Sequence, residues 1–539
     1  MRVAVIAPPY PLEEAPAPPL GVCYVAAAFE RAGAEVRIFD FVVSEYSEKK
    51  LRALMDDFQP DLVGSTSVTM NFFQAAEIVR AAKRIRPETV AVMGGPHVSF
   101  WAKEALARYP ELDLVVKGEG EGTIADLTPV LSDRAAWEKI PGLCFRKDGA
   151  VVDTGARELI CDLDALPMPA RHLLPLSRYQ ALGFPVSIIT SRGCPNQCIF
   201  CLGRRMVGRK VRYRDPRLVV DEIEHLVSLG FGRINVADDL FTSNKERVAA
   251  VCDEIGRRGI NVAWSAFSRV NTVDEETLRI MRKAGCDCVS FGIESGDPEM
   301  LKRIRKGITL DQARRAAELC KKTNMLAHAS FMVGLPGETP ESLATTEEFA
   351  VSLDIIYGYH FLAPFPGTTV YEDLKEYDLK VLTDDFSLYD ANRPVVETSA
   401  VPASAAASFV KAHEDRCEKE WQRILDGYDK GTNTPDENLR VEGNRKLGLV
   451  FSILDYDFVE KYGAIRPEDL NNPVAALKPL VSAVTRETGK PPELVEKVLA
   501  DFVRRGLLVV SRNGEGACFA WKENPAFARY EERPLSAAC

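Results

Sequence analysis

The segment SRGCPNQCIFC (residues 191–201) contains three cysteines, Cys194, Cys198 and Cys201, in the pattern C-x-x-x-C-x-x-C. Thiolates bind zinc ions and iron–sulfur clusters. A structural zinc site takes four ligands, and no further cysteine or histidine follows at zinc-finger spacing. A cubane cluster also takes four thiolates as a rule, so three on one loop leave one iron atom open for another ligand. The segment therefore predicts a cluster with an open corner, with a zinc knuckle or a structural cluster as the alternative.

Six strand patterns alternate with helical patterns between residues 184 and 385, and the cysteines follow the first of them. The strand patterns cover residues 186–193, 233–238, 261–269, 288–296, 328–337 and 359–367. Because a closed barrel of this kind has eight such units, six of them predict a partial, open (β/α)6 barrel of the TIM type. Such barrels carry their active residues at the C-terminal ends of the strands, where these cysteines lie.

Residues 1–135 show the same alternation, which predicts an α/β, doubly wound, Rossmann-like domain. Ligands of such sheets bind at the carboxyl ends of the strands. Those ends carry small, glycine-rich segments: PPYPLEEAPAPPLG (8–21), GSTSVTMN (64–71), GGPHVSF (94–100) and KGEGEGT (117–123). Four such loops at one sheet edge predict a ligand site, although ordinary turns have a similar composition.

Two further regions complete the predicted organisation. Residues 136–183 contain several prolines and no sustained period, which is typical of a linker, with a short strand pair at AVVDTGARELI (150–160). Residues 386–539 contain amphipathic helical patterns. They end in PELVEKVLADFVRRGLLVVSRNGEGACFAW (492–521), which resembles a small winged-helix module. We expect this mostly helical domain to close over the barrel rather than to bind DNA.

The composition is that of a globular protein of several domains. The chain has 539 residues, 68 basic and 78 acidic side chains and a net charge of −10, which argues against a nucleic-acid partner. One basic segment, GRRMVGRKVRYRDPR (203–217), is either a solvated loop or a site for phosphate or carboxylate groups.

Neither a membrane helix nor a signal peptide is predicted, so we expect a cytoplasmic protein. In that reducing compartment, cysteines within apolar runs are expected to be buried and free: Cys23, Cys252, Cys286, Cys288 and Cys320.

The cysteine pattern after the first strand of a partial barrel, with Phe200 before the last cysteine, resembles the radical S-adenosylmethionine (SAM) superfamily. The resemblance implies that Cys194, Cys198 and Cys201 bind a [4Fe–4S] cluster. It implies that the open iron binds the amino and carboxylate groups of SAM. One electron from the cluster would then cleave SAM to methionine and a 5′-deoxyadenosyl radical that abstracts hydrogen from carbon.

The ends of the second and third strands supply further SAM-binding candidates under this resemblance. Asp238, Asp239 and Asn244 match the position where the family holds the methionine amino group. Arg269 ends the third strand and is expected to pair with the methionine carboxylate. The alternative for each is a helix cap or a structural turn.

The fourth and fifth strands supply the remaining SAM-binding candidates. SFGIESG (290–296) places Glu294 or Ser295 toward the ribose or the methionyl end. FMVGLPGET (331–339) places Gly334 and Gly337 near the adenine, where glycine permits close approach.

The N-terminal domain resembles the cobalamin-binding domain of cobalamin-dependent radical SAM enzymes, and the joint resemblance covers residues 1 to about 385. The positions implied to contact cobalamin are Pro19, Leu20, Gly21, Ser65, Thr66, Ser67, Gly94, Gly95, His97, Gly118 and Glu119. The motif D-x-H-x-x-G, which supplies a histidine below cobalt, is absent after the first strand, so cobalamin is expected without a histidine ligand. His97 either contacts the corrinoid or is a packed histidine, and some relatives keep this domain without binding a corrinoid.

The resemblance implies an enzyme, most directly a C-methyltransferase that uses two SAM molecules and methylcobalamin on an unactivated carbon. One alternative is a cyclase or rearrangement enzyme, similar in layout to the anaerobic magnesium-protoporphyrin ester cyclase. Another is a non-catalytic corrinoid- or cluster-binding regulator. The substrate is expected to be a small molecule or a peptide bordered by Tyr359, His360 and Phe365, with a low-potential electron donor as partner.

Overall fold

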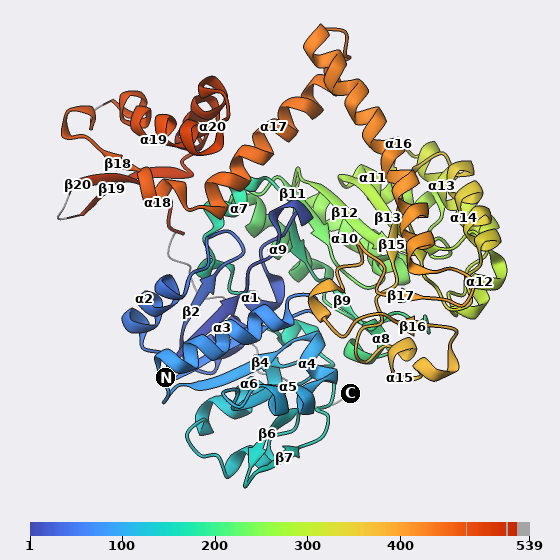
Figure 1. Ribbon diagram of the computed structural model, residues 1–539, viewed down its shortest axis with the longest axis horizontal. Helices are drawn as coiled ribbons and strands as arrows, with labels where there is room; N and C mark the ends of the chain where they lie inside the picture. The colour runs from blue at the N-terminus through green and yellow to red at the C-terminus, as the bar shows by residue number, and fades with distance from the viewer. Residues whose placement is uncertain (471, 514–515, 525–539) are drawn as a thin grey trace.

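The computed structural model describes residues 1–524 except 471 and 514–515 (Figure 1). The end of the predicted C-terminal domain, residues 525–539, lies outside the described residues. The chain forms an N-terminal α/β part, a barrel part and a mainly helical C-terminal part (Figure 1). In the described ranges, no helix is long and apolar enough to cross a membrane.

The first sheet has seven strands in the order β2-β1-β3-β4-β5-β6-β7. Its strands are β1 (Arg2–Ala7), β2 (Glu35–Asp40), β3 (Leu62–Thr66), β4 (Val90–Gly94), β5 (Leu114–Val116), β6 (Leu143–Lys147) and β7 (Ala150–Asp153). The first five are parallel, as a doubly wound domain requires. Along β1, Val3 and Val5 pack into one core and Ala4 and Ile6 into the other, because both faces are covered by helices.

Six helices cover the two faces of this sheet. Helices α1 (Leu20–Arg31) and α6 (Glu121–Leu127) contribute to the core on one face. The other face is covered by α2 (Glu48–Phe58), α3 (Phe72–Ile85), α4 (Pro96–Phe100) and α5 (Ala102–Arg108).

The sheet continues into the segment that the sequence assigns to a linker. Strands β6 and β7 form a hairpin, and β6 pairs antiparallel with β5. The hairpin turns at Asp148 and Gly149, which both have positive φ, the type I′ geometry that Asp-Gly favours. The observed pair is Leu143–Lys147 with Ala150–Asp153, so only its second strand falls within the strand pair predicted at 150–160.

The second sheet is the predicted open barrel. Its strands, in chain order, are β8 (Val186–Ile188), β11 (Arg233–Val236), β12 (Ala263–Ser268), β13 (Cys286–Glu294), β14 (Leu326–Val333) and β15 (Ile356–Phe361). All are parallel, and the edge strands β8 and β15 do not pair, which confirms six strands and an open wall.

Helices follow the barrel strands in sequence. They are α9 (Pro216–Ser228), α10 (Lys245–Arg257), α11 (Glu275–Lys283), α12 (Pro298–Arg303), α13 (Leu310–Lys322) and α14 (Pro340–Ser352). Each begins after a residue whose side chain accepts a hydrogen bond from the first turn: Asp215, Asn244, Asp274, Asp297, Thr309 and Thr339.

The inner wall of the barrel is partly accessible. On β14, Ala327, Ala329 and Phe331 are buried, whereas the alternating residues His328 and Ser330 are only half-buried. Closed barrels fill their interior with branched apolar side chains. The residues of β14 that alternate with its buried core positions therefore include polar, partly accessible side chains.

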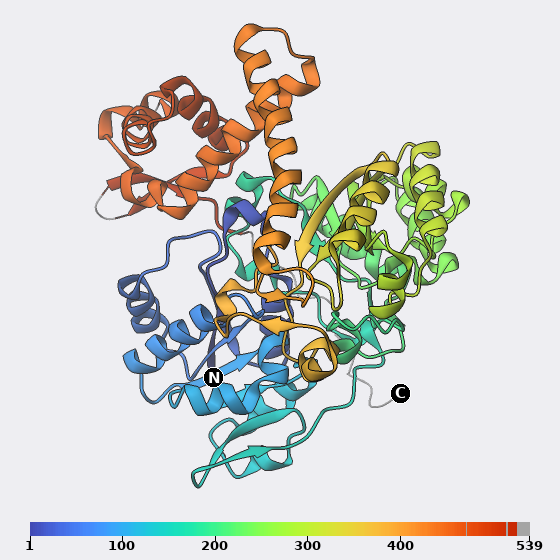
Figure 2. The ribbon, with the colours of Figure 1, turned by 45° about the vertical axis from the view of Figure 1, so that its right-hand side comes forward.

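The C-terminal part begins with a protruding helical hairpin formed by α16 (Ala403–Lys430) and α17 (Pro435–Asp455) (Figures 1 and 2). It continues with α18 (Phe458–Tyr462), β18 (Ala464–Ile465), α19 (Pro473–Thr488), α20 (Pro492–Arg504), β19 (Leu508–Asn513) and β20 (Gly516–Trp521). This element order, with a three-stranded sheet β18-β20-β19, is typical of a winged helix.

Within the C-terminal domain that is expected to close over the barrel, α16 packs against the barrel, where the Phe409 ring lies 5.0 Å from the Tyr359 ring on β15. The winged-helix module contacts other parts of the chain. It contacts the first domain, where Lys50 Nζ lies 2.7 Å from Asp457 Oδ2. It also contacts the connecting helix α7 (Leu176–Leu182), where Arg178 Nη1 donates to Asp457 Oδ1 at 2.9 Å.

The segment 362–401 joins the barrel to the first domain instead. Phe386 in this segment lies 4.7 Å from the His97 ring, measured between centroids. Val370 N donates to the Ile199 carbonyl in the cysteine loop at 3.0 Å. This segment is therefore the element that lies across both predicted cofactor regions.

Candidate functional site

The cysteine loop is held at its base by two short strands, β9 (Ser191–Arg192) and β10 (Arg212–Tyr213), which pair antiparallel. Cys194 N donates to the Gly208 carbonyl at 3.0 Å, which closes the loop further. Gly193 has φ of +116°, and a Cβ there would lie 2.3 Å from the Lys210 carbonyl oxygen. Only glycine fits this position. Its absence of a side chain lets the chain before the first cysteine pack directly against the backbone of Lys210.

Each cysteine sulfur accepts one hydrogen bond from nitrogen. Asn196 Nδ2 donates to Cys194 Sγ at 3.3 Å, and Gly203 N donates to Cys201 Sγ at 3.4 Å. Arg269 Nη1 donates to Cys198 Sγ at 3.7 Å. Such donors stabilise thiolates and tune iron–sulfur clusters, so the three sulfurs fit the ligand set of a cluster.

The three thiols also influence one another. The pKa of Cys201 is raised to about 11, mainly by loss of solvation and less by Cys198, Asp239 and Cys194, while the hydrogen bond from Gly203 N lowers it. Iron would reverse this effect, because a metal ion deprotonates a thiol that coordinates it. Within the part of the chain that the structure describes, no three metal-ligand side chains are close enough for a single ion. Cubane thiolates each bind a different iron, so they need not converge on one point.

A buried ion pair lies beside the cysteine loop. Lys306 Nζ is 2.7 Å from Glu294 Oε1 and 5.8 Å from the centre of the Phe200 ring. Glu294 has φ of +75°, a backbone conformation that costs energy for any residue except glycine. Sequence analysis missed Lys306; its only signal is the basic RIRKGIT segment after the fourth strand.

Arg269 lies next to this pair. Its guanidinium donates to the Lys306 carbonyl as well as to Cys198, so it connects the third strand with the cysteine loop. The preceding side chain, Ser268 Oγ, is buried with no hydrogen-bond partner among the described residues. A buried orphan hydroxyl at the end of β12 is the kind of group that a bound ligand satisfies.

The three SAM-binding candidates at the end of the second strand, Asp238, Asp239 and Asn244, have different hydrogen-bond partners and neighbours. Asp238 accepts hydrogen bonds of 2.6 Å from Thr190 N, Thr190 Oγ1 and Ser191 Oγ, which ties β11 to β8. Asn244 accepts from Arg247 N at 2.8 Å as the cap of α10. Asp239 lies against the loop, because a Cβ on Gly203 would be 3.0 Å from its Oδ1.

The candidates on the fourth and fifth strands lie in tight turns. Ser295 Oγ lies 3.1 Å from Thr346 Oγ1. Gly334 has φ of +87°, and its N–H donates to Glu338 Oε2 at 2.7 Å. Burial raises the pKa of Glu338 to about 8. A Cβ on Gly337 would overlap the Arg303 guanidinium, so this glycine permits close packing between α12 and the turn.

Of the three substrate candidates, Tyr359 and His360 lie on opposite sides of β15, and Phe365 follows that strand. The Tyr359 hydroxyl donates to Glu347 on α14, and its ring lies 5.0 Å from Phe409 on α16, so it faces outward. His360, the next residue, is exposed on the opposite side of the strand. Phe365 is half-buried in the segment 362–401. The structure therefore packs Tyr359 against α14 and α16, whereas His360 and Phe365 keep accessible surface.

In the first domain, the β3 and β4 loops contact each other closely. Gly95 has φ of +99°, and a Cβ there would lie 2.5 Å from Thr66 Oγ1 and 2.7 Å from the Ser67 carbonyl. Ser67 Oγ and His97 Nε2 are buried without a hydrogen-bond partner among the described residues. Two orphan polar atoms at this edge fit a ligand rich in amides, such as cobalamin.

His97 lies in an aromatic cluster. Its ring is 4.3 Å from Phe72 and 5.4 Å from Trp101, and its Nδ1 is 3.3 Å from Thr69 Oγ1. Burial lowers the pKa of His97 to about 3, so the ring is neutral at physiological pH.

The remaining first-domain candidates are of three kinds. Pro19, Leu20, Gly21 and Gly118 have partly or fully exposed surfaces, and a Cβ on Gly21 or Gly118 would meet no described atom within 4 Å. Gly94 is half-buried at the end of β4, and Ser65 Oγ donates to the Ile6 carbonyl at 3.1 Å inside the sheet. Glu119 is buried, and both of its oxygens accept hydrogen bonds from Arg212, at 2.8 and 2.7 Å.

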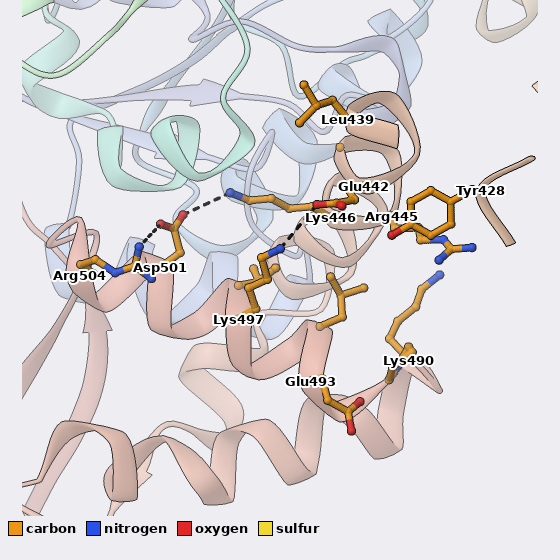
Figure 3. Close-up of a pocket in the computed structure, with 14 residues that line it drawn as sticks. Tyr428, Leu439, Glu442, Arg445, Lys446, Lys490, Glu493, Lys497, Asp501 and Arg504 are labelled. Atoms are coloured by element: carbon orange, nitrogen blue, oxygen red, sulfur yellow. Dashed lines mark hydrogen bonds and ion pairs between the residues drawn. The ribbon is translucent and has the colours of Figure 1, made fainter. Parts of the chain in front are cut away.

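A cavity of about 870 Å³ lies apart from these loops, between α17 and α20 (Figure 3). Its basic side chains mostly pair with carboxylates of the same cavity. Lys446 Nζ is 3.2 Å from Asp501 Oδ2, and Lys497 Nζ is 3.6 Å from Glu442 Oε2. This cavity is not part of the cysteine site.

Comparisons with known proteins agree with this two-part site. A family model described as Radical SAM superfamily matches residues 188–350, and one described as B12 binding domain matches residues 14–128. The radical SAM methyltransferase TsrM from Kitasatospora setae, solved with cobalamin and a [4Fe–4S] cluster, matches with a TM-score of 0.62 at 22% identity. That match covers 75% of this chain and 80% of TsrM, and at this identity it shows the fold alone.

Two relatives are similar in sequence. A Pyrococcus horikoshii protein named as an uncharacterized methyltransferase is 36% identical over 383 residues, which cover 70% of this chain and 83% of the relative. The anaerobic magnesium-protoporphyrin IX monomethyl ester cyclase of Cereibacter sphaeroides is 31% identical over 397 residues, which cover 71% of this chain and 64% of that enzyme.

The fold and the site define an enzyme that combines a cluster-binding barrel with a corrinoid-type domain. The chain belongs to the cobalamin-dependent radical SAM family. Its cofactors are therefore a [4Fe–4S] cluster, SAM and cobalamin.

Proposed function

We propose that this enzyme is a C-methyltransferase that acts on an unactivated carbon of a small molecule. The observation that carries the proposal is the pairing of two sites: three sulfurs that each accept an N–H hydrogen bond, and a glycine-lined sheet edge with two orphan polar atoms. The methyltransferase name of the Pyrococcus horikoshii relative supports methyl transfer over other reactions of the family. When bound, the cluster supplies the electron that cleaves SAM, and cobalamin carries the methyl group.

Cys194, Cys198 and Cys201 would hold the cluster, with Asn196 and Arg269 as donors to the sulfurs. Arg269 has a second role, because its bond to the Lys306 carbonyl fixes the chain that carries the neighbouring ion pair.

The Lys306–Glu294 pair would bind the methionine end of SAM. That end is a zwitterion, with one ammonium and one carboxylate, and the pair presents one charge of each sign within 2.7 Å. Charge-assisted hydrogen bonds in a buried site orient such a group strongly. Asp239, beside Cys201, would be the second carboxylate near the ammonium group. The turn that contains Gly334 and Gly337 would border the adenine through its backbone, because the space beside these two glycines is taken by Val396 and Arg303.

The first-domain edge would hold cobalamin through backbone and small side chains. Gly21 and Gly118 leave open surface, and Ser67 Oγ and His97 Nε2 would satisfy their hydrogen bonds with corrinoid amides. His97 cannot act as a cation there, because its pKa is about 3. The substrate would lie between this edge and the barrel, near His360 and Phe365.

Labelled SAM tests the proposal without knowledge of the substrate. The reconstituted enzyme, loaded with cobalamin and reductant, is incubated with SAM that carries a deuterated methyl group. We expect S-adenosylhomocysteine as a product and the methyl label in the corrinoid fraction by mass spectrometry. Release of methionine and 5′-deoxyadenosine alone, with no label in that fraction, would contradict methyl transfer.

A second candidate is ring formation without methyl transfer, favoured by the likeness to the Cereibacter sphaeroides cyclase. It predicts the same adenosyl cleavage and an unlabelled product that has lost hydrogen. Either reaction needs a low-potential electron donor and fits a cytoplasmic location, which the free buried thiols Cys23, Cys252, Cys286 and Cys320 support.

A further inference from the structure

Two arginines stand opposite each other at the base of the cysteine loop. Arg192 on β9 and Arg212 on β10 are direct partners in the antiparallel pair. Like charges in this position destabilise a strand pair. Both arginines are also buried, at 8% and 6% exposed. The base of the loop therefore requires negative charge from elsewhere in the chain.

The first domain supplies that charge from the loop after β5. Arg212 Nη2 and Nη1 donate to Glu119 Oε1 and Oε2 at 2.7 and 2.8 Å. Arg192 Nη1 lies 3.4 Å from Glu119 Oε1, and its Nη2 donates to Glu121 Oε1 at 2.6 Å. Two positive and two negative charges balance, and all four side chains are buried. We name these four residues, Glu119, Glu121, Arg192 and Arg212, the domain clamp.

The clamp is tied into both sites. On the barrel side, Arg212 Nη2 also donates to the Val207 carbonyl at 2.7 Å, in the chain that follows Cys201. On the first-domain side, Gly118 precedes Glu119 and has open surface around it. The ring of Tyr24, on the helix that begins beside Gly21, lies 5.3 Å from the Arg192 guanidinium carbon. One short loop thus borders the cobalamin edge and neutralises the base of the cysteine loop.

We propose that the domain clamp couples the two cofactor sites, so that cluster assembly on the cysteines tightens cobalamin binding and cobalamin binding stabilises the cluster. Such coupling is reciprocal by thermodynamic necessity. Arg212 lies in the basic segment 203–217. At least this side chain of the segment therefore binds a carboxylate, and that carboxylate belongs to Glu119 of the first domain. The coupling rests on the cofactor placement proposed above and is independent of whether a methyl group is transferred.

The test measures the dissociation constant of the complex between hydroxocobalamin and the full-length protein. It is measured once with the reconstituted cluster and once without it. For the unaltered protein, we expect the cluster to tighten binding about tenfold. For E119Q, which leaves the two arginines with one carboxylate, the ratio of the two constants should fall to about one, as expected for uncoupled sites. A purely structural defect would weaken binding alike in both states and leave the ratio unchanged.

Two further variants complete the design. In R212K the charge remains but the bidentate bond to Glu119 is lost, so the ratio should lie between those of the unaltered protein and E119Q. If E119Q does not fold, R212K decides by the same ratio. The control is E254Q on α10, where Glu254 also pairs with two arginines, Arg257 and Arg258, outside the cofactor region.

The outcomes separate the claims. A ratio of one in the unaltered protein, or an unchanged ratio in E119Q and R212K, would overturn the coupling. Absence of cobalamin binding in the unaltered protein in both states would instead overturn the proposed cofactor placement.

Discussion

The two cofactor sites are built by different means. In the barrel, three thiols and the Lys306–Glu294 pair present specific chemical groups, each with a defined partner. At the edge of the first sheet, the site is formed by glycines, backbone and two polar atoms that have no partner among the described residues, so it presents shape and little charge. Iron atoms are bound only by particular side chains, such as cysteine thiolates. A large corrinoid instead requires a wide accessible surface that matches its shape. The two sites should therefore respond to different substitutions.

The largest expected effect is loss of the cluster in C198S. This variant removes a ligand whose sulfur also accepts from Arg269. We expect iron content to fall from about four atoms per chain to near zero and SAM cleavage to be lost. Cobalamin should still bind, about tenfold more weakly, as the proposed coupling requires. Iron analysis and corrinoid absorbance measure the two parts separately. The control is C417S, at an exposed cysteine on α16; retention of the cluster in C198S would contradict the ligand assignment.

The next effect is on SAM affinity in K306M. Removal of Lys306 leaves Glu294 as a buried charge without its ion-pair partner. Such a deletion lowers the free energy of unfolding by about 3–5 kcal/mol. We expect SAM binding to weaken by about a hundredfold, as measured anaerobically by equilibrium dialysis. The matched control is K322M, which removes an exposed ion pair with Glu275. Unchanged SAM affinity in a folded K306M protein would show that the pair is only structural.

A smaller effect is expected at the first-domain edge in G95A. A Cβ at this positive φ would approach backbone atoms of Ser67 within 2.8 Å, so the two loops must separate. We expect cobalamin affinity to fall about tenfold at normal iron content, since such backbone strain costs about 1–3 kcal/mol. G259A is the control, because Gly259 has φ of +64° and no described atom near an added Cβ. Loss of iron rather than corrinoid in G95A would reverse the assignment of the two sites.

The smallest effect concerns pH and His97. Its pKa is lowered to about 3 in the folded state, so between pH 6.5 and 3 the unfolded chain binds the extra proton. Stability therefore falls as pH falls, by about 0.7 kcal/mol from pH 7 to pH 6. Denaturant unfolding of the cofactor-free protein should show this difference relative to H97Q, which does not titrate. Equal pH dependence of the two proteins would place His97 in contact with water.

Much of the architecture could be predicted from the sequence. The strand rhythm predicts both sheets and the open barrel, and the spacing of Cys194, Cys198 and Cys201 predicts the cluster loop. These features depend on short-range patterns, which the sequence displays directly. The sequence predicts a strand pair at 150–160, which covers β7, but not β6 or its pairing with the first sheet, although Asp148–Gly149 is a recognisable hairpin turn.

The polar partners could not be predicted in the same way. Glu119 pairs with Arg212, which is 93 residues away, and Lys306 pairs with Glu294, which ends β13 at a positive φ that the sequence does not reveal. Asp238, expected near SAM, uses its carboxylate to join two strands. Residue type indicates that such groups are chemically capable, but only the fold decides which of them are already engaged.

The most direct test of the account is the cofactor content of the full-length protein. It is purified without oxygen, reconstituted with iron, sulfide and hydroxocobalamin, and desalted before iron and corrinoid are quantified. The account predicts about four iron atoms and one corrinoid per chain. A full cluster without corrinoid would contradict it, because the first domain would then be a scaffold and the methyl-transfer proposal would fail.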